Sequence, residues 1–202
     1  MIKNVIVDIG NVLLEWNEDN IVKNISKDLA EQEKLKEVIF QSKDWAKLDA
    51  GTLTYTEAIQ LFERKLPISL KARTKDIMNS WYQYMLFYEK TCKLVKVLKE
   101  KKYNLYILSN THIPVYEYIK NSEIGDCFDG YIISSIERVL KPNKQIYIRL
   151  FEKFQLKPEE CYFIDDSELN IESAKECGMD GFVFQIDEFE KLRKDLIEKK
   201  II

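Results

Sequence analysis

Three aspartates in this chain stand where a metal ion or a phosphate ester could be held. Asp8 ends the apolar run VIVD, and Asp165 and Asp166 end the run CYFIDD. Carboxylates that lie close together repel each other, and a hard cation such as Mg²⁺ relieves that repulsion. An aspartate can also attack phosphorus and form an aspartyl-phosphate. Together these residues indicate phosphoryl transfer assisted by a metal ion.

Donor groups suited to phosphate follow other apolar runs. Ser109 and Asn110 end the run LYILSN, and with the next backbone amide they can hydrogen-bond phosphate oxygens. Lys141 precedes Pro142 in LKPNKQIY, and proline favours the first turn of a helix. We therefore predict that Pro142 lies in the first turn of a helix and that the ammonium of Lys141 neutralises phosphate charge at the same place.

The elements that must position these residues alternate between two kinds. Five short runs rich in β-branched and aromatic residues are typical of strands buried on both faces. They are VIVD, LYILSN, GYIISS, CYFIDD and GFVF. Amphipathic segments of helical length accompany the later strands, at residues 91–102, 144–154, 171–177 and 189–197. This alternation predicts an α/β fold, a parallel sheet with helices on both faces, whose ligands bind beyond the carboxyl ends of the strands.

A region without strands interrupts this alternation. From about residue 15 to about residue 89 the sequence is typical of several helices. The stretch TYTE, Thr54 to Glu57, is a capping box, in which the two side chains satisfy the first amides of a helix. The aromatic-rich stretch NSWYQYMLFY is predicted to pack within this helical insertion rather than to form a substrate cage.

Composition argues against several other classes of protein. The 202 residues carry a formal net charge of −3, and the pI is about 5.5, whereas nucleic-acid binders usually show a basic patch. No apolar run is long enough to span a membrane, and the N-terminal residues do not resemble a signal peptide. Four cysteines without a CxxC pair, and one histidine, favour reduced thiols over a zinc site or disulfides. We expect a cytoplasmic protein that binds neither nucleic acid nor membrane.

The motifs that carry these residues resemble those of the haloacid dehalogenase-like hydrolase superfamily, which includes many Mg²⁺-dependent phosphatases. Four motifs occur in the family's order, VIVDIGNVL, YILSNT, LKPNKQIY and YFIDDSELNIESAKECG. The DIGNV form most resembles a bacterial branch that includes an α-D-glucose-1-phosphate phosphatase. The resemblance implies a Rossmann-like α/β core at residues 1–14 and 90–202, with a small helical cap domain at 15–89.

The resemblance also implies a role for each chemical residue. Asp8 is the expected nucleophile and a Mg²⁺ ligand. Ser109 and Asn110 are expected to hold the phosphate. Lys141 is expected to steady both the phosphate and the nucleophile.

The expected metal site uses the same first strand and the fourth motif. Asp8, Asp166 and the backbone carbonyl of Gly10 are the implied direct ligands. Asp165 is expected to contact the metal through water, and Asn170 is expected to orient these groups.

Position 10 departs from the family pattern. Most phosphatases of the superfamily have a second aspartate there, which protonates the leaving alkoxide and later activates water. Gly10 can offer a carbonyl to a metal but cannot transfer a proton, a contribution worth roughly 10²–10⁴-fold in rate. A good leaving group such as an anomeric sugar phosphate, a water on Mg²⁺ or a side chain from the cap can compensate. One candidate is His112 in SNTHIP, although a partly exposed histidine at a helix start is the more conservative interpretation.

Three functions remain open on these grounds. The first is a Mg²⁺-dependent phosphatase that acts on a small phosphorylated metabolite, such as a sugar phosphate, through an aspartyl-phosphate. The second is a non-catalytic regulatory or binding protein on the same scaffold, a function suggested by glycine in place of the second aspartate at position 10. The third is a 2-haloacid dehalogenase, against which the adjacent acids Asp165 and Asp166 argue. The turn that contains Trp45, Asp49 and Gly51 is expected to face the site and to determine specificity.

Overall fold

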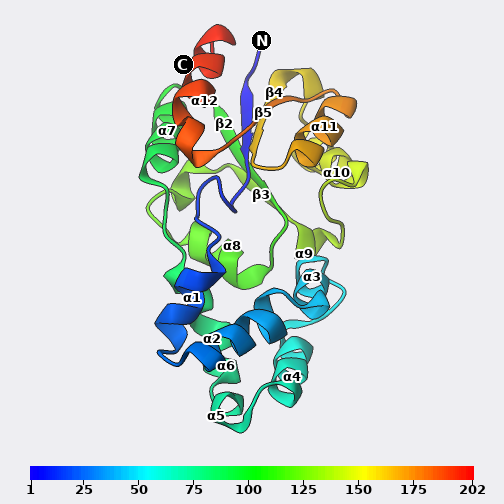
Figure 1. Ribbon diagram of the computed structural model, residues 1–202. Coiled ribbons are helices and arrows are strands. Elements are labelled where there is room, and N and C mark those ends of the chain that lie inside the picture. Colours follow the sequence, from blue (N-terminus) through cyan, green and yellow to red (C-terminus); the bar gives the residue numbers. More distant parts are fainter.

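A computed structural model describes all 202 residues and has a five-stranded parallel sheet at its centre (Figure 1). The strands are β1 (Asn4–Val7), β2 (Asn104–Ser109), β3 (Gly130–Ile133), β4 (Cys161–Asp165) and β5 (Asp180–Val183). Their order in the sheet is β3-β2-β1-β4-β5, and every neighbouring pair is parallel. The predicted α/β fold is confirmed.

Helices cover both faces of the sheet because successive side chains of a strand point to opposite sides. The covering helices are α7 (Glu89–Glu100) and α12 (Phe189–Glu198) on one face, and α10 (Lys144–Phe154) and α11 (Glu168–Glu176) on the other (Figure 1). Val5 and Val7 of β1 belong to a buried cluster with Leu98 of α7 and Leu196 of α12. Ile6, between them, belongs to a second cluster that α10 and α11 help to form.

The observed boundaries differ from the predicted ones where a cap residue decides them. The helix α10 has the predicted bounds, but Pro142 lies outside it, so the prediction for Pro142 was wrong. Asn143 is the N-cap instead, because its side chain accepts a hydrogen bond from the Gln145 amide. The helices α7 and α11 begin two and three residues earlier than predicted.

Two short helices occupy positions where none was predicted. The run GYIISS was expected to be a strand throughout, but β3 ends at Ile133 and the two serines begin α9 (Ser134–Glu137). The helix α8 (Ile113–Lys120) follows directly after the polar end of β2. Single turns of 3₁₀-helix complete the core at η3 (Gly125–Cys127), η4 (Pro158–Glu160) and η5 (Ile186–Glu188).

The helical insertion lies between β1 and α7 and forms the lower part of the view in Figure 1. It contains α1 (Glu18–Ile25), α2 (Leu29–Leu35), η1 (Lys36–Phe40), α3 (Lys43–Asp49), α4 (Tyr55–Lys65), α5 (Ile68–Lys71), α6 (Thr74–Ser80) and η2 (Trp81–Tyr84). The predicted capping box is present at the start of α4, where Thr54 and Glu57 each accept from the other's backbone amide.

Two chain segments join the helical insertion to the sheet and run side by side. The Tyr88 amide donates to the Leu13 carbonyl at 2.9 Å, and the Glu15 amide donates to the Leu86 carbonyl at 2.8 Å. Leu14 and Phe87 form an isolated antiparallel bridge between them. Residues 13–15 and 86–88 thus form a two-stranded linker ribbon.

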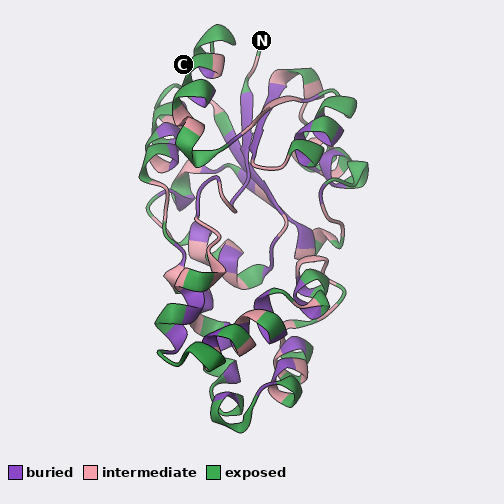
Figure 2. Ribbon diagram, viewed as in Figure 1, coloured by how far each residue is buried: buried purple, intermediate pink, exposed green.

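One continuous apolar cluster extends from the sheet into the helical insertion. Four aromatic rings meet there, Trp16, Phe40, Trp45 and Trp81, with ring centroids between 4.9 and 6.1 Å apart. Figure 2 shows the buried residues along the sheet and on the inner sides of the helices. Packing of this kind fixes the helical insertion against the sheet.

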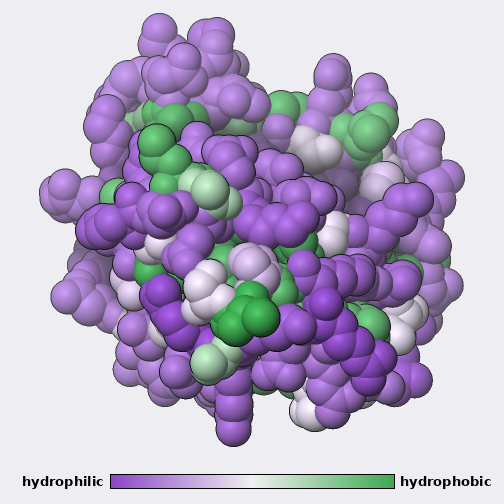
Figure 3. All heavy atoms as spheres, turned by 60° about the horizontal axis from the view of Figure 1, so that its bottom comes forward, coloured by the Kyte–Doolittle hydropathy of each residue, from purple (hydrophilic) through white to green (hydrophobic).

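The outer surface of the helical insertion is mainly polar. Figure 3, in which this end of the molecule comes forward, shows mostly hydrophilic residues, with hydrophobic residues in small separate groups. None of the helices has the length and apolar character needed to cross a lipid bilayer.

The capping box generates a prediction for stability. Replacing Thr54 by Ala is expected to lower the free energy of unfolding by about 1 kcal/mol, because the hydroxyl that accepts the Glu57 amide is lost. Urea unfolding followed by circular dichroism measures the change. Thr56→Ala, at an exposed position of the same helix, is the control, with an expected change within about 0.5 kcal/mol. Equal losses in the two variants would contradict the capping role.

Candidate functional site

Three neighbouring strands end in polar residues at one edge of the sheet. The strand β1 lies between β2 and β4, and all three are parallel. Asp8 directly follows β1, Ser109 is the last residue of β2, and Asp165 is the last residue of β4. The structure therefore brings together the strand-end residues that the sequence singled out.

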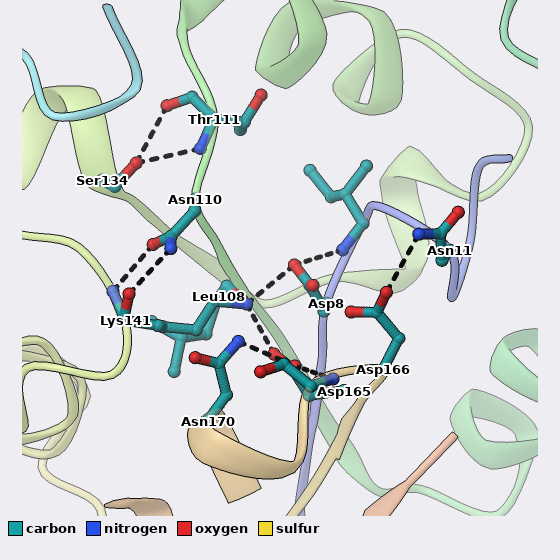
Figure 4. Close-up of polar contacts among 12 residues, drawn as sticks. Asp8, Asn11, Leu108, Asn110, Thr111, Ser134, Lys141, Asp165, Asp166 and Asn170 are labelled. Carbon is teal, nitrogen blue, oxygen red and sulfur yellow. Dashed lines mark hydrogen bonds and ion pairs between the residues drawn. The ribbon is translucent and has the colours of Figure 1, made fainter. Parts of the chain in front are cut away.

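The ammonium of Lys141 joins these strand ends (Figure 4). Its Nζ lies 2.9 Å from Asp8 Oδ1 and 2.6 Å from Asp165 Oδ2. It also donates a hydrogen bond of 2.9 Å to the carbonyl oxygen of Leu108. The side chain of Lys141 is 1% exposed and that of Asp165 is fully buried. The three donors of the buried ammonium are thus all used, two by carboxylates and one by a backbone carbonyl.

Burial and neighbouring charges set the protonation of this group. Burial raises the pKa of Asp8 to about 7, the charge of Lys141 opposes that rise, and the carboxylate of Asp165 adds to it. Burial also acts to lower the pKa of Lys141, but the two carboxylates outweigh it, so that pKa lies above its usual value. Lys141 is therefore charged at neutral pH, and a cation bound at Asp8 would favour the ionised carboxylate there.

Asp165 is held by donors on both of its oxygens. Oδ2 faces Lys141, and Oδ1 accepts hydrogen bonds from the Ser167 amide at 2.9 Å and from Asn170 Nδ2 at 2.8 Å. The hydroxyl of Tyr147 in turn donates to the Asn170 carbonyl at 2.8 Å. With its oxygens occupied in this way, Asp165 is better placed to orient its neighbours than to bind a metal directly.

Asp166 is more open, and its partner is a residue that the sequence analysis missed. Its Oδ2 accepts a hydrogen bond of 2.9 Å from Asn11 Nδ2, while Asn11 Oδ1 accepts the Trp16 amide at 3.1 Å. Asn11 has a left-handed backbone with φ of 53°. Asparagine tolerates that conformation better than most residues, and this was the available signal in DIGN.

The three acids form a group that fits a divalent cation. Carboxylate oxygens of Asp8, Asp165 and Asp166 all lie within 4.8 Å of one another. Only one lysine compensates them, and Asp166 makes no ion pair in the structure. Such a cluster of oxygen ligands suits Mg²⁺.

The side chain of Asn110 is committed to Lys141. Its Oδ1 accepts the Lys141 amide at 2.8 Å, and its Nδ2 donates to the Lys141 carbonyl at 2.9 Å. The Thr111 amide, which the sequence suggested as a phosphate donor, donates to Ser134 Oγ at 2.9 Å instead (Figure 4). The side chain of Asn110 therefore fixes the backbone that carries Lys141.

A cavity of about 330 Å³ opens beside the acids, between the sheet edge and the helical insertion. Asp8, Asp166 and Ser109 lie on its sheet side. Its opposite wall comes from the helical insertion and includes aromatic rings and two acids, namely Trp16, Glu18, Phe40, Trp45, Asp49 and Trp81. Trp45 and Asp49 line the cavity, as expected, but they belong to the helix α3, so the expectation that they form a turn was wrong. Trp81 both packs within the helical insertion and lines the cavity.

Gly10 also lines the cavity, and its lack of a side chain leaves free space. A Cβ built on Gly10 would meet no atom within 4 Å. Its φ is not in the positive range, so the backbone at position 10 does not require glycine. The chain therefore has room for a side chain at this position but carries none.

His112 is buried, so the expectation of a partly exposed histidine was wrong. It is the N-cap residue of α8 and is 3% exposed, because the helical insertion covers it. Its Nδ1 lies 2.7 Å from Oδ1 of Asp49, the last residue of α3. Burial raises the pKa of Asp49, and the hydrogen bond with His112 opposes that rise.

The turn after Asp49 packs against the segment that follows β3. Ser134 Oγ donates a hydrogen bond of 2.5 Å to the Asp49 carbonyl. Gly51 has φ of 65°, and a Cβ there would overlap the backbone of Ser135. Glycine at position 51 thus permits the close approach that carries Asp49 to the cavity.

Comparison with known proteins places the chain among enzymes of one kind. A family model described as haloacid dehalogenase-like hydrolase matches residues 2–178. D-ribitol-5-phosphate phosphatase of Bacteroides thetaiotaomicron is 26% identical over 193 residues, which span 90% of this chain and 91% of the relative. A sesquiterpene phosphatase of Aspergillus oryzae is 23% identical over 183 residues, which span 89% and 88% of the two chains.

A solved structure shares the fold. It is a HAD family enzyme of Bacteroides thetaiotaomicron in complex with magnesium and inorganic phosphate. It superposes with a TM-score of 0.74 at 24% identity, covering 92% of this chain and 96% of that chain.

The buried charges generate a prediction for stability. Lys141→Met is expected to lower the free energy of unfolding by about 3–5 kcal/mol, because Asp8 and Asp165 lose the charge that compensates them. Denaturant unfolding measures this loss. Lys144→Met removes an exposed ion pair with Glu176 and is expected to cost less than about 1 kcal/mol. If the two variants are equally stable, the buried ammonium does not hold the site together.

Proposed function

The chain belongs to the haloacid dehalogenase-like hydrolases, and from that membership we propose that it is a Mg²⁺-dependent phosphatase acting through an aspartyl-phosphate on Asp8. The observation that carries the proposal is the strand-end carboxylate of Asp8, which Lys141 holds beside Asp166 on the wall of a cavity. The substrate is a small phosphorylated metabolite.

The proposed metal site uses the oxygen ligands at the sheet edge. Asp8, Asp166 and the carbonyl of Gly10 would bind Mg²⁺ directly, and Asp165 would act through water. When bound, Mg²⁺ supplies positive charge that offsets the charge of the phosphate and of the carboxylates.

The chain's own residues prepare Asp8 for attack. Oδ1 of Asp8 accepts hydrogen bonds from the Ile9 amide at 2.7 Å and from Lys141 at 2.9 Å, which hold this oxygen in place. Ser109 and Asn110 belong to the proposed phosphate-binding segment, and Ser109 lies on the same cavity wall. An oxygen of Asp8 attacks phosphorus, the bond to the leaving oxygen breaks, and water later cleaves the aspartyl-phosphate.

The helical insertion is the proposed cap domain, at residues 15–89, over a core of residues 1–14 and 90–202. Its aromatic residues close one side of the cavity, which excludes water from the reacting phosphate. A volume of about 330 Å³ suits a small metabolite rather than a polymer. The names of the two curated relatives describe a pentitol phosphate and a terpenoid as substrates, so likeness to them leaves the leaving group open.

A phosphatase accounts for the acids better than a dehalogenase does. Attack on a 2-haloacid needs one aspartate and no cation, whereas this site gathers Asp165 and Asp166 beside Asp8. The buried charges of Asp8 and Lys141 likewise favour a catalyst over a protein that only binds a ligand.

The proposal is tested by phosphate release from p-nitrophenyl phosphate and from a panel of phosphorylated metabolites that includes glucose 1-phosphate and D-ribitol 5-phosphate. Activity is expected with Mg²⁺, and EDTA and Asp8→Asn are each expected to abolish it. Asp126→Asn, an exposed position near the amino end of β3, is the matched control and should keep full activity. Equal phosphate release by wild type and Asp8→Asn would show that Asp8 is not the nucleophile. Metal-independent release of chloride from 2-chloropropionate would support a dehalogenase instead.

A further inference from the structure

Glycine at position 10 leaves the proposed reaction without a group that transfers protons. The ionisable side chains on the cavity wall are those of Asp8, Glu18, Asp49, His112 and Asp166. Asp8 and Asp166 already serve as nucleophile and metal ligand in the proposed function. Glu18 lies in the first turn of α1, where its carboxylate accepts a hydrogen bond from an exposed glutamine. The remaining two groups, Asp49 and His112, are in contact with each other.

We propose that Asp49, positioned by His112, is the general acid and base of this enzyme and replaces the acid absent at position 10. The inference rests on the proposed phosphatase function and adds to it a catalytic residue contributed by the helical insertion. His112 acts through Asp49 and is a positioning residue.

The geometry leaves one oxygen of Asp49 free for the substrate. Oδ1 contacts His112 Nδ1 at 2.7 Å, and Oδ2 makes no hydrogen bond within the protein. The side chain of Asp49 is 20% exposed and lies on the cavity wall that also includes Asp8. A leaving group in the cavity therefore has an unoccupied carboxyl oxygen on the side contributed by the helical insertion.

The surroundings of His112 favour a fixed imidazole. Its ring lies among the rings of Trp45, Tyr55 and Trp81, at centroid distances of 4.8, 5.7 and 5.6 Å. Its Nε2 is buried and has no hydrogen-bond partner. With no second polar partner, the imidazole has a single strong contact, the one to Asp49. The contact orients the carboxyl group and stabilises it after the proton has left.

Burial of Asp49 suits it to carry a proton. Removal of a carboxyl group from water disfavours its charged form, and burial raises the pKa of Asp49 in this way. A carboxylic acid that keeps its proton nearer to neutral pH is a more effective general acid.

The two proton transfers balance over the reaction. In the first step an oxygen of Asp8 bonds to phosphorus, the bond from phosphorus to the leaving oxygen breaks, and Asp49 gives its proton to that oxygen. The product alcohol leaves, and Asp49 remains as a carboxylate beside His112. In the second step a water oxygen bonds to phosphorus, a proton of that water returns to Asp49, and the bond from phosphorus to Asp8 breaks. Inorganic phosphate leaves and both aspartates are restored.

Asp49 lies at the cavity because the helical insertion packs against the segments that follow the strands of the sheet. Asp49 comes from α3, and both of its anchors, His112 and Ser134, come from the segments after β2 and β3. Proton transfer by Asp49 thus depends on the packing of the helical insertion against the sheet.

The test uses the dependence of rate on the leaving group. Alkyl phosphates need a proton on the leaving oxygen, whereas p-nitrophenolate leaves without one. Asp49→Asn is expected to lower kcat/KM for an alkyl phosphate by roughly 10²–10⁴-fold and for p-nitrophenyl phosphate by less than about tenfold. The ratio kcat/KM is compared because it reports the steps through departure of the leaving group. His112→Gln should lower kcat/KM for the two substrates with the same preference, more for the alkyl phosphate, but by smaller factors than Asp49→Asn.

A matched control and a rescue separate chemistry from folding. Asp44→Asn removes another carboxylate from the same helix, one that pairs with Lys47 and Lys65 away from the cavity. It should leave kcat/KM for both substrates unchanged. Gly10→Asp adds a carboxylate where a Cβ has free space. The double variant Gly10→Asp/Asp49→Asn should recover at least about tenfold of the lost alkyl phosphatase activity.

The outcomes distinguish this inference from the proposed function. A wild type that hydrolyses no phosphate ester with Mg²⁺ overturns the phosphatase proposal and the role of Asp49 with it. An active wild type whose Asp49→Asn variant retains alkyl phosphatase activity overturns the role of Asp49 alone. Equal losses on both substrates, without rescue by Gly10→Asp, would assign Asp49 to folding or binding and would also overturn that role.

Discussion

The charge of Lys141 is the constraint around which the site is arranged. An uncompensated carboxylate or ammonium costs several kcal/mol to bury, so Asp8, Asp165 and Lys141 can occupy the interior only together. Their contacts need the ends of β1, β2 and β4 side by side, which is what the strand order of the sheet provides. Asn110 also helps to position Lys141, because the oxygen and the nitrogen of its side-chain amide each hydrogen-bond the backbone of Lys141.

The helical insertion does more than cover this charged centre. Its aromatic rings form one apolar cluster with residues of the sheet, while Asp49 and Glu18 place acids on the cavity wall. No lysine or arginine lines the cavity, although the chain has 31 of them. The positive charge of Lys141 contacts Asp8 from the protein interior and does not line the cavity, and the wall opposite is apolar and acidic.

The core was predictable from the sequence because local pattern and global fold agree there. The runs VIVD, LYILSN and CYFIDD have the composition of buried strands, and their polar last residues mark the ligand edge. The partner of Asp166, Asn11, was missed because a single left-handed residue leaves little pattern in a sequence. The burial of His112 was missed for another reason: residues 49 and 112 are far apart in the chain, and only the packing of the helical insertion against the sheet brings them into contact.

The linker ribbon joins by backbone hydrogen bonds the two chain segments that enter and leave the helical insertion. Leu14 accepts the Asn11 amide through its carbonyl and forms a bridge with Phe87, so two chain crossings share one set of backbone hydrogen bonds. Asn11 in turn contacts Asp166 at the sheet edge. The contacts Phe87 to Leu14, Leu14 to Asn11 and Asn11 to Asp166 thus form a continuous connection from the linker ribbon to the acidic cluster. Asn11 therefore couples the backbone that carries the helical insertion to the carboxylate of Asp166, so a substitution of Asn11 would disturb both.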